Sequence, residues 1–352
     1  MRQGSHNPRG RVPGRFDRLL HLGNVVVDIV LTVPTFPERG GDVLAGRART
    51  AAGGGLNVMA AATRQGLPTA YAGAHGTGPF GTVARAAMAE EGIGIIQPVK
   101  AGLDTGFVVT VVEASGERTF LTSRGAEATL TAGDLELVRP RARDAVYVSG
   151  YGLVHDSNRA ALLGWLPRLG GGNTMFFDPG PLVGSIPAAA LATVLGRADW
   201  LTCNAREAAI LAGGTAPRAA AAALARRSGR AGRPGRASRD RGPWVLVRTG
   251  PGGCLIGRPD GAVVHVPGFR VNVLDTTGAG DTHSGALIAA LAAGAAETAA
   301  ARSANAAAAL SVSRPGPATA PTGKELARFL AAQRAGDSGN AGLPGTPSRG
   351  TT

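Results

Sequence analysis

Short apolar runs alternate with longer helical stretches along most of the chain. Residues 19–33 (LLHLGNVVVDIVLTV) are apolar through their centre and broken by Asp28, which is typical of a strand buried on both faces. A carboxylate there costs free energy unless it meets a partner or a ligand, or unless the strand has already reached solvent. Further strands are predicted at residues 70–73, 145–149, 174–178, 200–203 and 244–248, and helices at residues 57–65, 82–91, 157–169, 187–195, 205–213, 217–227, 297–310 and 325–334. This alternation predicts an α/β protein with a doubly wound, mainly parallel sheet and helices on both faces.

A second, smaller sheet is predicted from strands outside this series. Residues 106–113 and 117–123 flank the sequence Ala-Ser-Gly, which is the pattern of a β-hairpin. A short alternating strand at residues 42–50 follows a turn rich in proline and glycine. We therefore expect a small β lid formed within about residues 29–50 and 105–124.

The stretch DTTGAGDTHSGALIAALAAG, residues 275–294, is the centre of the predicted architecture. It follows Val271, Val273 and Leu274, which fit the end of a strand, and reads as a glycine-rich turn and then a buried helix from Thr282 onward. The backbone N–H groups of Gly278, Ala279, Gly280 and Asp281 would be unpaired at this corner, and the helix dipole would make it suit an anion. The carboxylate of Asp281 is well placed to accept a proton from a hydroxyl that attacks a phosphate. An ordinary helix N-cap is the alternative for Asp281.

The net charge of +13 is carried mainly by two segments. Residues 215–243 hold eight arginines and one acidic residue, and residues 1–18 hold five arginines and one acidic residue. Only Phe16 offers these segments an aromatic ring for stacking on a base, so we expect no specific nucleic-acid binding.

The composition also indicates the domain organisation and the cellular compartment. Residues 1–16 and 331–352 are predicted to be disordered tails, and residues 228–243 a basic low-complexity insertion, around one folded unit at residues 17–330. The two cysteines give no disulfide framework and no metal-binding spacing. No apolar run is long enough to span a membrane, so we expect a cytoplasmic protein.

Several motifs resemble those of one enzyme family. There is no GxxxxGK[ST] phosphate loop, and the GxGxxG at residues 76–81 contains a proline and reads as a loop before a helix. DTTGAGD resembles the C-terminal signature of the ribokinase-like (PfkB) carbohydrate kinases. In the family's order, AGGGLN, NARE, RTGPGG and NAAAALSVSRPGP resemble its other motifs, at residues 52–57, 204–207, 248–253 and 305–317. The resemblance covers residues 19–327 and implies the ribokinase-like fold.

The resemblance implies ATP-dependent phosphorylation of a hydroxyl of a small sugar or sugar-like substrate. The general base would be Asp281, and the anion hole would be formed by Gly278, Ala279 and Gly280. Substrate hydroxyls would be held by Asp28, Gly53, Gly54 and Asn57. ATP would lie against Asn204, Arg248, Gly250, Gly253 and Asn305. Mg²⁺ would be positioned, largely through water, by Asn204 and Glu207, and K⁺, as in some members, by a loop with Asp275 and Thr277.

Alternatives remain for the substrate and for some of these residues. A nucleoside kinase is disfavoured because few aromatic residues lie near the acceptor motifs. A phosphosugar kinase needs cationic groups in the lid, for which Arg118 and Arg124 are available, and a non-catalytic sugar- or nucleotide-binding regulator is the alternative outside catalysis. The lid, often a dimer surface in this family, implies a homodimer. Asn204 and Glu207 also fit a plain helix cap.

The chain departs from the family pattern at several positions. Val26 stands where many members have an asparagine, and Ala52 replaces the first glycine of the glycine pair. Thr77 and Gly78 replace an acidic pair, so any role of those carboxylates is lost. The neighbouring His75 is either a substrate-side group or a structural histidine.

Overall fold

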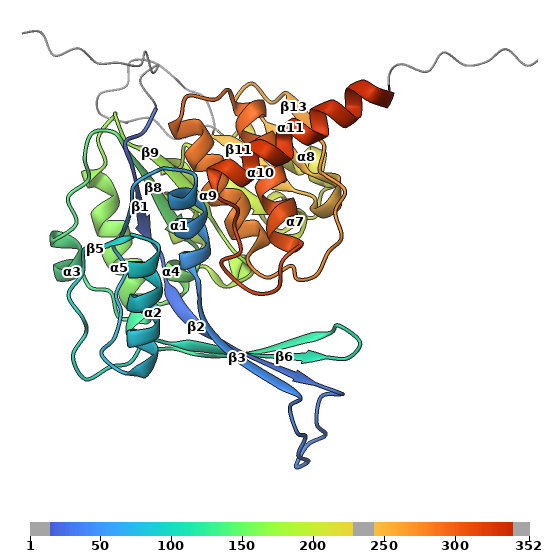
Figure 1. The fold of residues 1–352 in the computed structure, drawn as a ribbon. Helices are drawn as coiled ribbons and strands as arrows, with labels where there is room; N and C mark the ends of the chain where they lie inside the picture. The colour runs from blue at the N-terminus through green and yellow to red at the C-terminus, as the bar shows by residue number, and fades with distance from the viewer. Residues whose placement is uncertain (1–14, 228–242, 341–352) are drawn as a thin grey trace, which may run out of the picture.

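The computed structural model describes residues 15–227 and 243–340, which form two β-sheets and the helices around them (Figure 1). The expectations for residues 1–14, 228–242 and 341–352 lie outside the described residues.

A nine-stranded sheet forms the core of the molecule. Its strands are β1 (Arg18–Leu22), β4 (Thr69–Tyr71), β5 (Gly94–Ile95), β8 (Asp144–Ser149), β9 (Thr174–Asp178), β10 (Trp200–Asn204), β11 (Trp244–Arg248), β12 (Cys254–Gly257) and β13 (Val263–Val266). Their order is β13-β12-β11-β10-β9-β8-β1-β4-β5, with every neighbouring pair parallel except those made by β12. The predicted mainly parallel sheet is confirmed.

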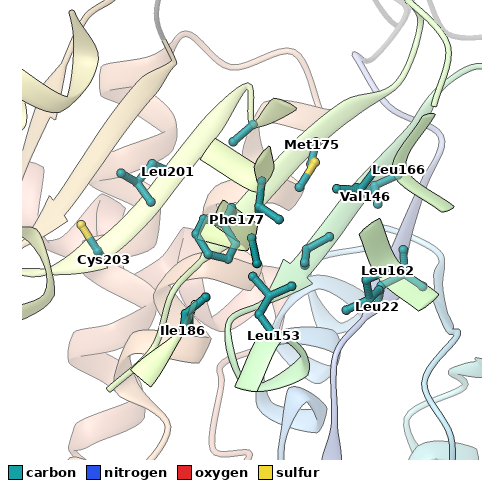
Figure 2. Close-up of a cluster of buried hydrophobic side chains, with 14 of the residues drawn as sticks. Leu22, Val146, Leu153, Leu162, Leu166, Met175, Phe177, Ile186, Leu201 and Cys203 are labelled. Carbon is teal, nitrogen blue, oxygen red and sulfur yellow. The ribbon is translucent and has the colours of Figure 1, made fainter. Parts of the chain in front are cut away.

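Helices cover both faces of this sheet because alternate strand residues bury apolar side chains on opposite sides. The helices α3 to α8 pack on one face: α3 (Ala132–Glu136), α4 (Tyr151–Val154), α5 (Asp156–Trp165), α6 (Ala188–Arg197), α7 (Ala205–Ala212) and α8 (Pro217–Ala225). On the other face lie α1 (Gly55–Arg64), α9 (Ala279–Ala292), α10 (Glu297–Val312) and α11 (Gly323–Asn340), with α2 (Pro79–Glu90) beside α1. Figure 2 shows the first core, in which Val146, Met175, Phe177 and Leu201 from adjacent strands belong to one hydrophobic cluster with Leu162 of α5.

An aromatic stack fills part of the opposite core. Phe176, Trp200 and Trp244 lie on the neighbouring strands β9, β10 and β11. Their ring centroids are 5.9 Å and 5.4 Å apart and the rings are nearly parallel. The stack ties together the strands whose carboxyl ends carry the polar residues described below.

The second sheet has four strands and projects from the core (Figure 1). Its order is β3-β2-β6-β7, built from β2 (Val25–Val33), β3 (Arg47–Gly54), β6 (Phe107–Glu113) and β7 (Arg118–Ser123). The predicted hairpin is β6 and β7, and the sheet is the expected small β lid. We call these four strands the lid.

The prediction of one continuous core strand at residues 19–33 was wrong. The chain leaves the core sheet after Leu22, turns at Gly23 and Asn24, and enters the lid as β2. A Cβ atom at Gly23 would lie 2.5 Å from Cε1 of His21, so the turn has no room for a side chain. Asp28 therefore belongs to the lid, where it pairs in register with Ala51 and Val108.

Three further expectations are corrected at the C-terminal side. Residues 267–278 form no strand, because Val273 and Leu274 lie in a loop and are 53% and 60% exposed. The helix α9 begins at Ala279, three residues earlier than expected. The last helix, α11, continues to Asn340, into the segment expected to be a disordered tail.

No single helix within residues 15–227 and 243–340 is long and apolar enough to cross a membrane. The helices α7 and α8 meet the length and composition test only as a pair, across a bend of 56°.

Candidate active site

The N-terminus of α9 lies at the corner expected to bind an anion, with one free donor fewer than predicted. Gly278 precedes the helix with φ 70°, a left-handed conformation that strongly favours glycine. The N–H of Ala279 reaches the carbonyl of Thr276 at 3.3 Å, and the N–H of Thr282 reaches that of Gly278 at 2.8 Å. Within the described part of the chain, no backbone carbonyl accepts from the N–H groups of Gly278, Gly280 and Asp281, which remain available to an anion.

Asp281 is held in the first turn of α9 by a residue from a distant helix. Its Oδ2 atom accepts a hydrogen bond of 3.0 Å from Nδ2 of Asn57 in α1. Burial and the nearby charge of Asp178 raise the pKa of Asp281 to about 6, although the Asn57 bond and Arg248 oppose the rise. The carboxylate is therefore ionised at neutral pH with a basicity suited to taking a proton.

The acceptor-side residues of the lid lie close to this carboxylate. Asp28 in β2 lies so near Gly53 in β3 that a Cβ atom at Gly53 would sit 2.0 Å from the Asp28 Oδ2 atom. Burial, together with the charge of Asp281, raises the pKa of Asp28 to about 6, and Arg49 of β3 opposes this. The structure thus brings Asp28, Gly53, Asn57 and Asp281 together, as the sequence predicted.

The orientation of Asn57 is fixed by the loop that follows α10. Its Oδ1 atom accepts a 2.9 Å hydrogen bond from the N–H of Ala318, which leaves Nδ2 free to donate to Asp281. Ala318 has φ 51°, an unusual left-handed value for a residue with a side chain. Arg64 holds this loop by donating to the carbonyls of Ala318 and Ala320 at 2.8 and 2.7 Å.

A buried polar cluster lies behind Gly280. Arg248 at the end of β11 donates 3.1 Å hydrogen bonds to Asp178 Oδ2 and to Ser284 Oγ, and its Nη2 atom lies 3.7 Å from Glu207 Oε2. A Cβ atom at Gly280 would lie 3.3 Å from Nε of Arg248. Arg248 thus holds its guanidinium between two carboxylate partners, and its expected place beside the ATP phosphates stays a prediction. The guanidinium lies beneath the anion corner.

Asn204 and Glu207 form a helix capping box at the start of α7. The backbone N–H of Asn204 donates to Oε2 of Glu207, and its Nδ2 atom donates to Oε1. The backbone N–H of Glu207 donates to Oδ1 of Asn204. Each of the three hydrogen bonds is 2.8 Å long. Burial and Asp178 raise the pKa of Glu207. Both oxygens are engaged and a guanidinium is near, so the pair does not fit direct coordination of Mg²⁺. No group of three or more His, Cys, Asp or Glu side chains in the described ranges could hold a metal ion.

The other residues expected on the nucleotide side, Gly250, Gly253 and Asn305, have structural roles in the loops around them. Gly250 and Gly253 have φ 64° and 90°, and a Cβ atom at Gly253 would lie 2.2 Å from the carbonyl oxygen of Val266. Asn305 is buried and donates to the carbonyls of Val266 and Pro267 at 3.0 Å, while its Oδ1 atom faces Nε2 of His283. Its amide thus makes hydrogen bonds within the protein, and its expected place near adenine stays a prediction.

Asp275 and Thr277 are bridged by an arginine of the lid. Arg118 at the start of β7 donates to Asp275 Oδ1 and to Thr277 Oγ1, both at 3.0 Å. Asp275 also accepts from the N–H groups of Thr277 and Gly316 at 2.9 Å. Because these oxygens already have donors, the residues do not fit a K⁺ site.

Sequence reasoning missed several of these contacts. Asp178 is a polar residue at the end of a parallel strand, a position that often faces a ligand. Asp104 accepts from the N–H groups of Phe80 and Gly81 at 3.1 and 2.7 Å, so a carboxylate from another segment serves the loop that lacks the family's acidic pair. His75 is buried with Nε2 facing the Gln97 carbonyl at 3.0 Å, as a structural histidine would be.

Comparisons with known proteins identify the family and the fold. The family model of the pfkB family carbohydrate kinases matches residues 17–323. The uncharacterized sugar kinase YegV of Escherichia coli (strain K12) is 31% identical over 309 residues, which cover 87% of this chain and 91% of that protein. The ATP-dependent ribose-1-phosphate kinase of Halopiger xanaduensis is 29% identical over 318 residues, covering 89% and 98%.

Among solved structures, a putative ribokinase II from E. coli in complex with ATP and Mg²⁺ has the same fold. Its TM-score is 0.73 at 22% identity, and the match covers 90% of this chain and 99% of that one. With a family match over nearly the whole folded unit and a sugar kinase above 30% identity, the chain belongs to the pfkB family of carbohydrate kinases, phosphotransferases with a hydroxyl group as acceptor.

Proposed function

We propose that this protein transfers the γ-phosphoryl group of ATP to a hydroxyl of a small sugar or sugar-like substrate, with Asp281 as the general base. The observation that carries the proposal is the position of Asp281, in the first turn of α9 with its carboxylate held by Asn57. The relatives named above are a sugar kinase and a ribose-1-phosphate kinase, which supports a sugar as acceptor.

The proton step follows from the surroundings of Asp281. The substrate hydroxyl would lie between Asp281 and the lid, where Asp28 and the backbone at Gly53 and Gly54 can bind its neighbouring hydroxyls. Asp281 accepts the proton as the oxygen attacks phosphorus, and Asn57 keeps the carboxylate pointed at the hydroxyl. Because the pKa of Asp281 is about 6, we expect kcat to fall as the pH drops below that value.

The anion corner supplies the second element of catalysis. The N–H groups of Gly280 and Asp281 and the positive end of the α9 dipole face the transferred phosphoryl group, whose equatorial oxygens carry its charge. Fixed donors of this kind stabilise a transition state without reorganising. Mg²⁺ bound with the ATP phosphates would neutralise part of their charge. A role for Asn204 and Glu207 toward that ion, through water, stays a prediction.

A phosphosugar remains the second candidate substrate, since one relative acts on ribose 1-phosphate. Arg118 is engaged with Asp275 and Thr277, so that of the two predicted lid cations the exposed Arg124 is the one available to a second phosphate.

An ADP-release screen tests the proposal. The wild-type protein is incubated with ATP, Mg²⁺ and, separately, free sugars, sugar acids, phosphosugars and nucleosides. ADP formation that depends on a free sugar or sugar acid is the expected result. ADP with a phosphosugar alone would select the second candidate. No ADP from any acceptor would favour a sugar- or nucleotide-binding regulator on the same scaffold.

A further inference from the structure

The lid and the anion corner are joined by one arginine side chain. Arg118 lies on β7, an edge strand of the lid, and its guanidinium fork reaches Asp275 Oδ1 and Thr277 Oγ1, 157 and 159 residues away in sequence. Thr277 immediately precedes Gly278, the residue that opens the anion corner. The fork therefore restrains the loop directly before the donors that face the phosphoryl group.

Both carboxylate oxygens of Asp275 already accept hydrogen bonds, and its charge is balanced without a further cation. Its Oδ1 atom accepts from Arg118 and from the Thr277 N–H, and its Oδ2 atom accepts from the Gly316 N–H. Although burial raises the pKa of Asp275, these donors lower it overall, so the carboxylate is ionised and balanced by a guanidinium that stays charged at any physiological pH. A monovalent cation at this loop would have to displace Arg118 and would meet its positive charge.

A second arginine of the lid reinforces the contact. Nη1 of Arg49 in β3 lies 3.5 Å from the carbonyl oxygen of Pro315, next to the Gly316 N–H that binds Asp275. The two outer strands of the lid, β3 and β7, thus hold the two loops that converge on Asp275.

From this geometry we infer that Arg118 is a positioning residue that takes the place of a monovalent cation, locking the lid to the anion corner so that turnover needs no added K⁺. The inference rests on the proposed kinase function for its activity readout. It departs from the K⁺ loop that the family resemblance implied, because here the charge is part of the chain.

The activity test compares wild type, Arg118→Ala and Arg118→Lys, with the exposed lid arginine variant Arg47→Ala as the matched control. Each is assayed with ATP, Mg²⁺ and the acceptor found by the screen, in tetramethylammonium chloride and in potassium chloride of equal ionic strength. Wild type and Arg47→Ala should turn over equally in both salts. Arg118→Ala should lose about tenfold in kcat from a misplaced anion corner, with part of the loss restored by K⁺ and by lysine.

A wild-type rate that rises severalfold with K⁺ would overturn the inference. So would an Arg118→Ala rate equal to that of wild type, or a slow rate that neither K⁺ nor lysine improves.

Hydrogen exchange tests the lock without any substrate. In the full-length protein alone, the amides of Thr277 and Gly316 should exchange faster in Arg118→Ala than in wild type, and at the wild-type rate in Arg47→Ala. Unchanged exchange in Arg118→Ala would overturn the lock even if the enzyme is active. If no acceptor gives ADP, the proposed function fails while this measurement still decides the contact.

Discussion

The core end of the active site and the lid are built in opposite ways. At the core end, Asp178 at the end of β9 and Glu207 in the first turn of α7 are buried. The partly buried Arg248 at the end of β11 lies within reach of both. The lid is a four-stranded sheet whose edge strand exposes Phe120 and Leu121 by 61% and 54%. The core therefore fixes the charges for phosphoryl transfer, whereas the lid presents substrate contacts on a sheet that can be altered at low cost to the fold.

The largest expected effect is at the junction of the two regions. Asp281→Asn keeps the shape of the side chain but cannot take a proton, so kcat should fall about 10²–10⁴-fold while ATP still binds. Steady-state kinetics and ATP titration measure the two effects, with the exposed Asp260→Asn as the control. Turnover near the wild-type rate would remove Asp281 from its assigned role.

Next in size is the loss of the buried guanidinium. Arg248→Met should lower the free energy of unfolding by about 3 kcal/mol, because it leaves Asp178 and Glu207 buried without a counter-charge. Arg258→Met, which removes an exposed ion pair with Asp260, should change it by less than about 0.5 kcal/mol. Denaturant unfolding measures the free energy of unfolding of both variants. An equal loss in the two would contradict the prediction, because the core ion pairs would then contribute no more than the surface pair.

A pH effect on stability should arise in the core. His21 is fully buried, has no hydrogen-bond partner for either ring nitrogen in the described structure, and its pKa is lowered to about 3 by burial. Between pH 6.5 and about 3 the unfolded chain binds a proton there and the folded chain does not, so this histidine costs stability as the pH falls. From pH 7 to 5 the cost is about 2 kcal/mol.

His21→Phe isolates that contribution. Each protein is compared with itself at pH 7, so that any packing defect cancels, and the variant should lose about 2 kcal/mol less than wild type on acidification. Asp28 and Asp281, whose pKa values are raised to about 6, act with the opposite sign in both proteins. Identical pH profiles for variant and wild type would contradict the prediction.

In the lid, a substrate contact should affect catalysis and not stability. Asp28→Asn should lower kcat/KM for the acceptor about tenfold, because a charged hydrogen-bond acceptor for hydroxyls is lost. The melting temperature should stay the same or rise, since the substitution removes a partly buried charge. A large loss of stability with unchanged kcat/KM would assign Asp28 to the fold.

The smallest effect is expected on the outer surface of the lid. Phe120→Ser should change the free energy of unfolding by less than about 0.5 kcal/mol, whereas Phe177→Ala in the core should cost about 3–5 kcal/mol. If the cost of Phe120→Ser grows with protein concentration, the lid surface is covered by a second copy in solution, as the family resemblance led us to expect.

The sequence predicted the core better than the lid for a physical reason. Strands covered on both faces, such as β8 and β9, are continuous apolar runs that end at a polar residue, and both were placed correctly. The separation of β1 from β2 escaped prediction because the run stays apolar as it passes from core to lid across Gly23 and Asn24. At Val273 and Leu274 the error was a strand predicted where none exists, because these residues are apolar but lie in an exposed loop.

The sequence motifs identified several site residues, but they did not predict the hydrogen-bond partners of the arginines. Asp281, Asn57, Asp28 and Gly53 were named from the sequence, and the structure brings them together. The partners of the arginines were not foreseen, because an arginine 70 residues from its aspartate in sequence gives no local signal of the contact.

The aromatic stack has a spectroscopic consequence. The three tryptophans of the sequence, Trp165, Trp200 and Trp244, all lie in the core, on α5 and on strands β10 and β11. Intrinsic emission therefore reports the melting of the core and is silent about the lid. A fourth indole on the exposed edge strand of the lid, in Phe120→Trp, would give that sheet an optical signal of its own, so that its closure over a bound sugar could be timed separately from unfolding.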